Sequence, residues 1–185
     1  KTFATDYLKQ KNIDIIDADK IARNILSSGT EGLLQVTQAF GPAILDSRGQ
    51  LNRQKLRRLA FANEQALERL NTITHPLIRQ TLLSDLKRAN QYPYVVLSAP
   101  LLFENHLQEY CEAVVVIDIP ETLQLIRGMN RDNQARADIA NIIAKQLSRQ
   151  QRLRLANYVI DNSGEVKSTQ AQLDKLHRHL VMLNR

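Results

Sequence analysis

Four short apolar segments of the chain have the pattern of β-strands. They occupy residues 12–19, 92–100, 113–120 and 157–164. The second and third are almost continuously apolar, which is typical of strands buried on both faces of a sheet. The first ends in two aspartates and the fourth in turn-forming residues, so polar side chains follow these strand ends.

Longer segments with apolar residues at helical spacing separate these strands. They cover residues 63–89, 121–131, 135–155 and 169–183. The last has one apolar face, formed by Leu173, Leu176, Leu180 and Leu183. The pair His75-Pro76 interrupts the first, and we expect the proline to break or kink that helix. Helices that alternate with buried strands predict an α/β fold with a doubly wound parallel sheet.

The connection between the first two strands is unusually long. It has about 70 residues, whereas a crossover between parallel strands needs only about a dozen. Its first part, residues 26–51, is rich in glycine and is expected to be loop-rich. Because sheets of this class bind ligands beyond the carboxyl ends of their strands, residues 26–91 are predicted to form a helical substrate-binding insertion.

The composition indicates in which cellular compartment the protein is expected to work. No apolar run reaches the ~18 residues that a membrane-spanning helix needs, and no apolar export signal is visible. Cys111 is the single cysteine, so no intrachain disulfide can form, and its thiol is expected to be inert. These features favour one domain over residues 1–185 in the reducing cytoplasm, without a membrane partner.

The charge favours an anionic partner. The chain has 25 Lys and Arg residues against 19 Asp and Glu residues, a formal net charge of +6. Nucleic acid, an acidic membrane and phosphorylated small molecules would all suit this balance. With five Tyr, four Phe and no Trp, the chain is poorly equipped to stack bases, and its basic residues are dispersed over several helices. Nucleic acid is therefore the weaker candidate.

Polar residues that could bind a ligand or take part in catalysis lie at both ends of the segment 1–19. Lys1-Thr2 precede a helical pattern, as the last two residues of a G-x-x-x-x-G-K-[ST] phosphate loop do, although alone they suit an ordinary charged terminus better. Asp17 and Asp19 follow the first strand, where two carboxylates could bind metal or take a proton from a hydroxyl. The alternative is capping, with Asp19 placed as the N-cap of a helix that begins near Lys20.

Paired arginines follow the third strand. Arg127 and Arg131 are four residues apart and share a helix face, so they could clamp a transferring phosphoryl group. A solvated basic face explains the pair about as well. Of Arg149, Arg152 and Arg154, at least two are expected to be surface charges.

Six segments, taken together in order and spacing, resemble bacterial dephospho-coenzyme A kinases of the P-loop kinase family. They are IIDADKIAR (15–23), FGPAIL with RGQLNRQKLRRLAF (within 40–61), LNTITHPLIR (70–79), APLLFEN (99–105), VVVIDIPETLQLIRGMNRD (114–132) and ANYVIDNSG (156–164). Lys1 precedes Asp19 by 18 residues, the interval between the phosphate-binding lysine and the second aspartate of the DAD motif in that family. This spacing outweighs the reading of Lys1-Thr2 as an ordinary terminus.

The resemblance implies ATP-dependent phosphorylation of the ribose 3′-hydroxyl of dephospho-CoA, which gives CoA and ADP in the final step of coenzyme A synthesis. It also implies a P-loop NTPase-type three-layer α/β/α fold with a parallel sheet, the helical insertion and a lid at residues 127–150. The family's first strand and its G-G-I-G-x-G loop are not in this sequence. Two explanations stay open: the protein carries them beyond the printed residues, or it lacks them.

The resemblance further implies residue roles. ATP would be bound by Lys1, Thr2, Phe3, Arg127, Arg131, Asn162 and Gly164. Mg²⁺ would be held by Thr2 and Asp17, and Asp19 would act as the catalytic base with Lys1, Arg127 and Arg131 stabilising the transferring group. Dephospho-CoA would contact Asp17, Asp19, Arg53, His75, Arg79, Glu104 and Asn105.

Two other functions stay open at this stage. Another small-molecule P-loop kinase, with a nucleoside or nucleotide acceptor, would use the same lysine, aspartates and arginines. A non-catalytic anion-binding protein would use only the positive charge. A monomer is expected, with an oligomer as the alternative.

Overall fold

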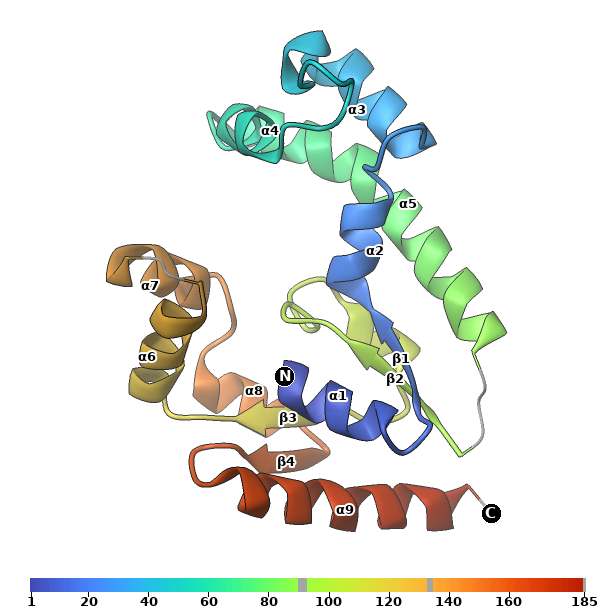
Figure 1. Ribbon diagram of the computed structural model, residues 1–185, viewed down its shortest axis with the longest axis vertical. Helices are drawn as coiled ribbons and strands as arrows, with labels where there is room; N and C mark the ends of the chain where they lie inside the picture. Colours follow the sequence, from blue (N-terminus) through green and yellow to red (C-terminus); the bar gives the residue numbers. More distant parts are fainter. Residues whose placement is uncertain (90–92, 133–134, 185) are drawn as a thin grey trace. The chain divides into compact units, whose positions relative to one another are not determined.

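The chain divides into two compact units, which are described one at a time. A computed structural model describes residues 1–89, 93–132 and 135–184, without the side chains of residues 131, 132 and 142 (Figure 1). The first unit comprises Lys1–Ile15 and Asn90–Arg185, and the second comprises Ile16–Ala89. In the part of the chain that is described, no helix is long and apolar enough to cross a membrane.

The first unit is built around the parallel strands β3 (Val115–Asp118) and β4 (Tyr158–Asp161). Their register pairs Val115 with Tyr158 and Asp118 with Asp161, so both strands end together on an aspartate. The other elements of this unit are α1 (Thr2–Lys9), β2 (Val95–Ser98), the 3₁₀ helix η2 (Leu107–Tyr110), α6 (Glu121–Asp132), α7 (Arg136–Ala144), α8 (Arg149–Leu155) and α9 (Val166–Leu183).

Helices α1 and α9 share an apolar core with this pair of strands. Ala4, Ile160, Leu173 and Leu176 are buried in it, and α9 lies along β4 (Figure 1). The apolar face predicted for the last helix is therefore confirmed at Leu173 and Leu176, while Leu183 is exposed at its end. Burying each leucine of this kind contributes about 1.5–3 kcal/mol.

A second strand pair consists of β1 (Asp14–Asp17) and β2. The described strands thus form two two-stranded sheets, β1–β2 and β3–β4. β1 is shorter than the predicted strand because helix α2 (Ala18–Asn24) begins directly after Asp17.

The second unit is helical. Its longest helix, α5 (Glu64–Arg88), is contacted by α2, α3 (Glu31–Phe40) and α4 (Arg53–Ala60). A core of Leu26, Val36, Ile44 and Leu56 lies among these elements and the 3₁₀ helix η1 (Pro42–Ile44). The loop-rich stretch predicted at residues 26–51 also contains a ten-residue helix, α3, which Thr30 caps by accepting the Leu33 N–H at 3.2 Å.

The proline in α5 does not end the helix. α5 continues through Pro76, so the predicted break does not occur, and a kink is the part of the prediction that stays open. Pro76 is exposed, while Thr74 and Leu82 on either side of it are buried. The loss of one backbone hydrogen bond is outweighed by the packing of three helices along α5, since tertiary burial contributes more than local propensity.

Candidate active site

A bidentate ion pair marks the carboxyl end of β3. Arg149, the first residue of α8, donates from Nε to Asp118 Oδ1 at 2.8 Å and from Nη2 to Asp118 Oδ2 at 2.6 Å. The Asp118 side chain is buried, with 11% of its surface exposed, whereas that of Arg149 is 41% exposed. The Arg149 guanidinium therefore holds the pKa of the Asp118 carboxyl below its usual range.

The turn after β4 is fixed to the same strand end. Its Asn162 donates its backbone N–H to the Asp118 carbonyl at 2.8 Å and accepts a bond from the Thr169 hydroxyl at 3.3 Å. The Ser163 backbone N–H donates a hydrogen bond to Asp161 Oδ1 at 2.8 Å, and hydrogen bonding from Ser163 lowers the pKa of the Asp161 carboxyl. Gly164 borders open space, since nothing lies within 4 Å of where a Cβ would be.

Arg127 meets this turn. Its Nη1 donates to the carbonyl oxygen of Asn162 at 2.7 Å, so the structure brings together two residues that the sequence predicted separately. The Arg127 side chain is exposed on α6 and can reach an anion near the strand ends. Arg131 lies in the same helix, but its side chain is outside the described residues.

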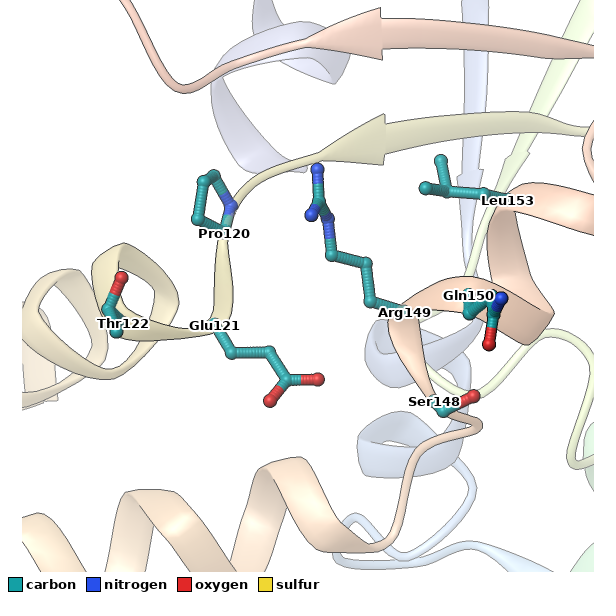
Figure 2. A pocket seen from close by; sticks show the side chains of 7 residues that line it. All are labelled: Pro120, Glu121, Thr122, Ser148, Arg149, Gln150 and Leu153. Carbon is teal, nitrogen blue, oxygen red and sulfur yellow. The ribbon is translucent and has the colours of Figure 1, made fainter.

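A pocket of about 560 Å³ opens beside this strand end. It is lined by Pro120, Glu121, Thr122, Ser148, Arg149, Gln150 and Leu153, from the start of α6 and the start of α8. Figure 2 shows Arg149 reaching from α8 toward the end of β3, and Glu121 pointing into the space from α6. The pocket therefore joins one acidic and one basic side chain at the edge where ligands of α/β sheets bind.

The start of α1 presents the other predicted ATP-binding residues of the first unit. The helix begins at Thr2, and no side chain caps it. The Lys1 carbonyl accepts the Thr5 N–H at 3.1 Å, and both Lys1 and Thr2 are exposed. Phe3 stacks on Tyr7 with ring centroids 6.3 Å apart. The uncapped N–H groups of this turn suit a phosphate.

In the second unit, Asp17 caps α2. Its Oδ1 accepts the backbone N–H groups of Asp19 at 2.9 Å and of Lys20 at 3.1 Å. This corrects the capping role expected for Asp19, because α2 begins at Ala18 and thereby places Asp19 inside its first turn. The two carboxylates consequently differ: Asp17 already accepts two bonds, and Asp19 belongs to the positive end of the helix dipole.

The remaining predicted acceptor residues are spread over several elements. Arg53 begins α4 and donates from Nη2 to the Arg23 carbonyl at 3.0 Å. His75 and Arg79 are exposed and four residues apart on α5. In the first unit, Asn105 is exposed, while the half-buried Glu104 accepts the Leu147 N–H at 2.5 Å.

Asp118 was missed by the sequence analysis, and Arg149 was grouped with residues expected to be mostly surface charges. A signal for Asp118 and Asp161 existed, because both end apolar strand patterns as Asp17 does. For Arg149 there was none, since its pairing depends on how α8 returns to the sheet.

The fold is an α/β fold of the P-loop NTPase type, with the parallel strands β3 and β4. Two solved structures have the same fold: TT1252 from Thermus thermophilus, at 23% identity and a TM-score of 0.81 over 95% of this chain and 89% of that one, and the dephospho-CoA kinase from Campylobacter jejuni, at 24% identity and 0.72 over 100% and 94%.

Sequence comparison identifies the particular family. The family model described as dephospho-CoA kinase matches residues 1–168. A dephospho-CoA kinase from Pseudoalteromonas translucida is 41% identical over 183 residues, covering 99% of this chain and 87% of its own length. One from Idiomarina loihiensis is 38% identical over 181 residues, covering 98% and 89%. The chain belongs to the dephospho-CoA kinase family.

Proposed function

We propose that the residues described above carry out the transfer of the γ-phosphoryl group of ATP to the ribose 3′-hydroxyl of dephospho-CoA. As a member of its family the chain is a kinase, a phosphotransferase, that acts on dephospho-CoA in coenzyme A biosynthesis. The observation that supports our assignment of residues most directly is the contact between Arg127 and Asn162, which lie 35 residues apart in the sequence and meet beside the end of β4.

The ATP-binding group lies in the first unit. Lys1 neutralises the β- and γ-phosphates, and the backbone of Phe3 at the start of α1 approaches the phosphates. Asn162 and Gly164 line the adenine with backbone groups, for which the open space around Gly164 leaves room. Arg127 and Arg131, on the predicted lid segment (residues 127–150), spread over the charge that develops on the γ-phosphoryl group.

The acceptor group includes the aspartates of the second unit. Asp19 takes the proton of the 3′-hydroxyl as it attacks, and Asp17 orders the chain around it by capping α2. In the second unit, Arg53, His75 and Arg79 bind dephospho-CoA within the insertion of residues 26–91. In the first unit, the segment 99–105 borders the acceptor through Asn105. The exposed guanidinium groups of Arg53 and Arg79 suit an acceptor that carries phosphates.

Mg²⁺ is compatible with the oxygen donors available. The described residues contain no group of three or more His, Cys, Asp or Glu side chains that could enclose a metal ion. Magnesium does not need such a cage, because it keeps several waters and binds through one or two protein oxygens and the substrate phosphates. Thr2, through its hydroxyl, and Asp17, through its carboxylate, would hold the ion, which would neutralise phosphate charge.

An acceptor panel tests this function. The full-length protein is incubated with ATP and dephospho-CoA, a nucleoside, a nucleoside monophosphate or 3′-deoxy-dephospho-CoA, and ADP release is measured. We expect turnover with dephospho-CoA alone. Turnover with a nucleoside or nucleotide, and none with dephospho-CoA, would favour the alternative acceptor class.

We further propose that the enzyme acts in the cytoplasm as a monomer.

A further inference from the structure

The peptide group of Leu147 is held from both sides. Its N–H donates to Glu104 Oε1 at 2.5 Å, and its carbonyl accepts from Arg152 Nη1 at 2.6 Å. Leu147 lies between α7 and α8, where the predicted lid segment returns to the sheet. Glu104 reaches it from a different part of the chain, 43 residues earlier.

The neighbours of Leu147 are fastened as well. Gln146 Oε1 accepts from Gln124 Nε2 on α6 at 3.1 Å, which joins the returning end of the lid segment to the part of α6 that precedes it. Two residues after Leu147, Arg149 makes its bidentate pair with Asp118. Residues 146–149, which we name the return hinge, are therefore tied to α6, to β3 and to the segment that follows β2.

Glu104 is well supported for this contact. Its own segment is ordered by backbone bonds from Asn105 to Leu101 at 3.1 Å and from Leu107 to Leu102 at 2.8 Å. The carboxylate is half-buried, and a backbone N–H bond to a carboxylate is stronger than one between neutral groups. A charged side chain thus fixes one amide of the return hinge.

We propose that Glu104 is a positioning residue that couples the segment 99–106 to the return hinge of the lid. It acts through the Leu147 amide, in place of the direct contact with dephospho-CoA that the family resemblance implies for it. The inference rests on the proposed function, in which that segment borders the acceptor and the lid carries Arg127 and Arg131. Binding of the acceptor against 99–106 then shifts the conformation of the return hinge. The lid arginines consequently reach the phosphoryl group only when both substrates are bound.

Two substitutions separate this role from direct substrate binding. Glu104→Gln keeps an oxygen that can accept the Leu147 N–H, whereas Glu104→Ala removes the acceptor. We expect Glu104→Ala to lower kcat about tenfold, with each KM changed less than about twofold. The reason is that the Glu104–Leu147 bond stabilises the closed lid in the wild-type protein, and the alanine variant lacks this bond. Glu104→Gln should stay within about threefold of the wild-type kcat. Glu109→Ala, an exposed residue of η2, serves as the matched control.

Amide hydrogen exchange followed by residue-resolved NMR supplies the second readout. Exchange at Leu147 should accelerate in Glu104→Ala and stay slow in Glu104→Gln and Glu109→Ala, with the core helices α1 and α9 unchanged. Faster exchange throughout α1 and α9 in Glu104→Ala would indicate a general structural role and overturn the proposal. Faster exchange at Leu147 with an unchanged kcat would overturn it too.

Failure of the inference and failure of the proposed function can be told apart. If both substitutions raise the KM for dephospho-CoA equally, Glu104 is a substrate contact and the inference is wrong while the function stands. If the wild-type protein phosphorylates a different acceptor, the proposed function fails. The ratio of kcat between Glu104→Ala and Glu104→Gln, measured with that acceptor, then still decides the coupling.

Discussion

Arg149 and Asp118 form a two-point ion pair, with N–O distances of 2.8 and 2.6 Å, between the first residue of α8 and the last residue of β3. The carboxylate is nearly enclosed and the guanidinium is partly open to solvent. The pair thus fixes the start of α8 at the end of β3. The residues that follow β3 and the start of α8 together line the candidate pocket.

Removing the arginine of this pair should destabilise the fold. Arg149→Ala leaves the buried carboxylate of Asp118 without its ion-pair partner, and because Arg149 is partly exposed we expect the free energy of unfolding to fall by less than it would for a fully buried pair. Arg154→Ala, at an exposed position of α8, should change the free energy of unfolding by less than about 0.5 kcal/mol. Urea unfolding of both variants measures the difference; equal stabilities would contradict the structural role.

The partly buried histidine His177 should make stability depend on pH. Its Nδ1 lies 2.8 Å from the Tyr94 hydroxyl, and burial, aided by the charge of Lys11 and opposed by Asp174, lowers its pKa from 6.5. The unfolded chain therefore binds the proton more tightly, so stability is fully present above about pH 6.5 and falls as the pH drops through the folded-state pKa.

Thermal unfolding between pH 5.5 and 7.5 tests this dependence. We expect His177→Gln to flatten the decline on the acidic side, because glutamine does not titrate. His75→Gln, at an exposed position of α5, should retain the wild-type slope. A slope that His177→Gln leaves unchanged would mean that another group carries the effect.

Gly32 should resist substitution despite its position in a helix. A Cβ at this position would lie 2.2 Å from the Ile25 carbonyl oxygen, and 3.2 Å from Leu77 Cδ1 on α5. Gly32→Ala should therefore destabilise the second unit by about 1–3 kcal/mol, although alanine is the better helix former. Gln38→Ala, at an exposed site of α3, should be close to neutral. A more stable Gly32→Ala protein would refute the close approach.

The proposed base has a separate test. Asp19→Asn should leave ATP affinity within about threefold and lower kcat by about 10²–10⁴, the usual contribution of a general base. Asp14→Asn, at an exposed position of β1, is the control and should retain activity. Single-turnover kinetics with saturating ATP measures the chemical step. A loss of only a few-fold in Asp19→Asn would assign proton removal to another group.

Arg131 can be assigned by comparing two kinetic constants. Arg131→Ala should reduce kcat by about 10²-fold or more while changing the KM for dephospho-CoA little, as expected of a group that acts on transition-state charge. Initial rates over a matrix of both substrates measure this. The opposite result, with a raised KM and a nearly normal kcat, would make Arg131 a residue that binds the acceptor.

Local patterns in the sequence predicted the main elements. The apolar runs located β2, β3 and β4, and the leucine spacing located the buried face of α9, because both depend on residues close in sequence. The family resemblance, now confirmed, rested on segments with fixed spacing. The residue roles it implied stay predictions.

Features that depend on distant contacts were not predicted. The continuation of α5 through Pro76 requires packing from three other helices. Asp17, and not Asp19, is the N-cap because α2 begins at Ala18, and local propensity does not define the first residue of a helix that closely. The contact of Glu104 with Leu147 joins two segments that carry no common pattern. Neither propensity nor spacing contains this information.

The identity of the product tests the central claim most directly. The full-length protein is incubated with ATP and dephospho-CoA, and the product is examined by ³¹P NMR and mass spectrometry. We predict one new phosphomonoester on the ribose 3′-oxygen, with one ADP formed for each CoA. A phosphate on another oxygen, or ADP formed without any phosphorylated dephospho-CoA, would contradict the assignment.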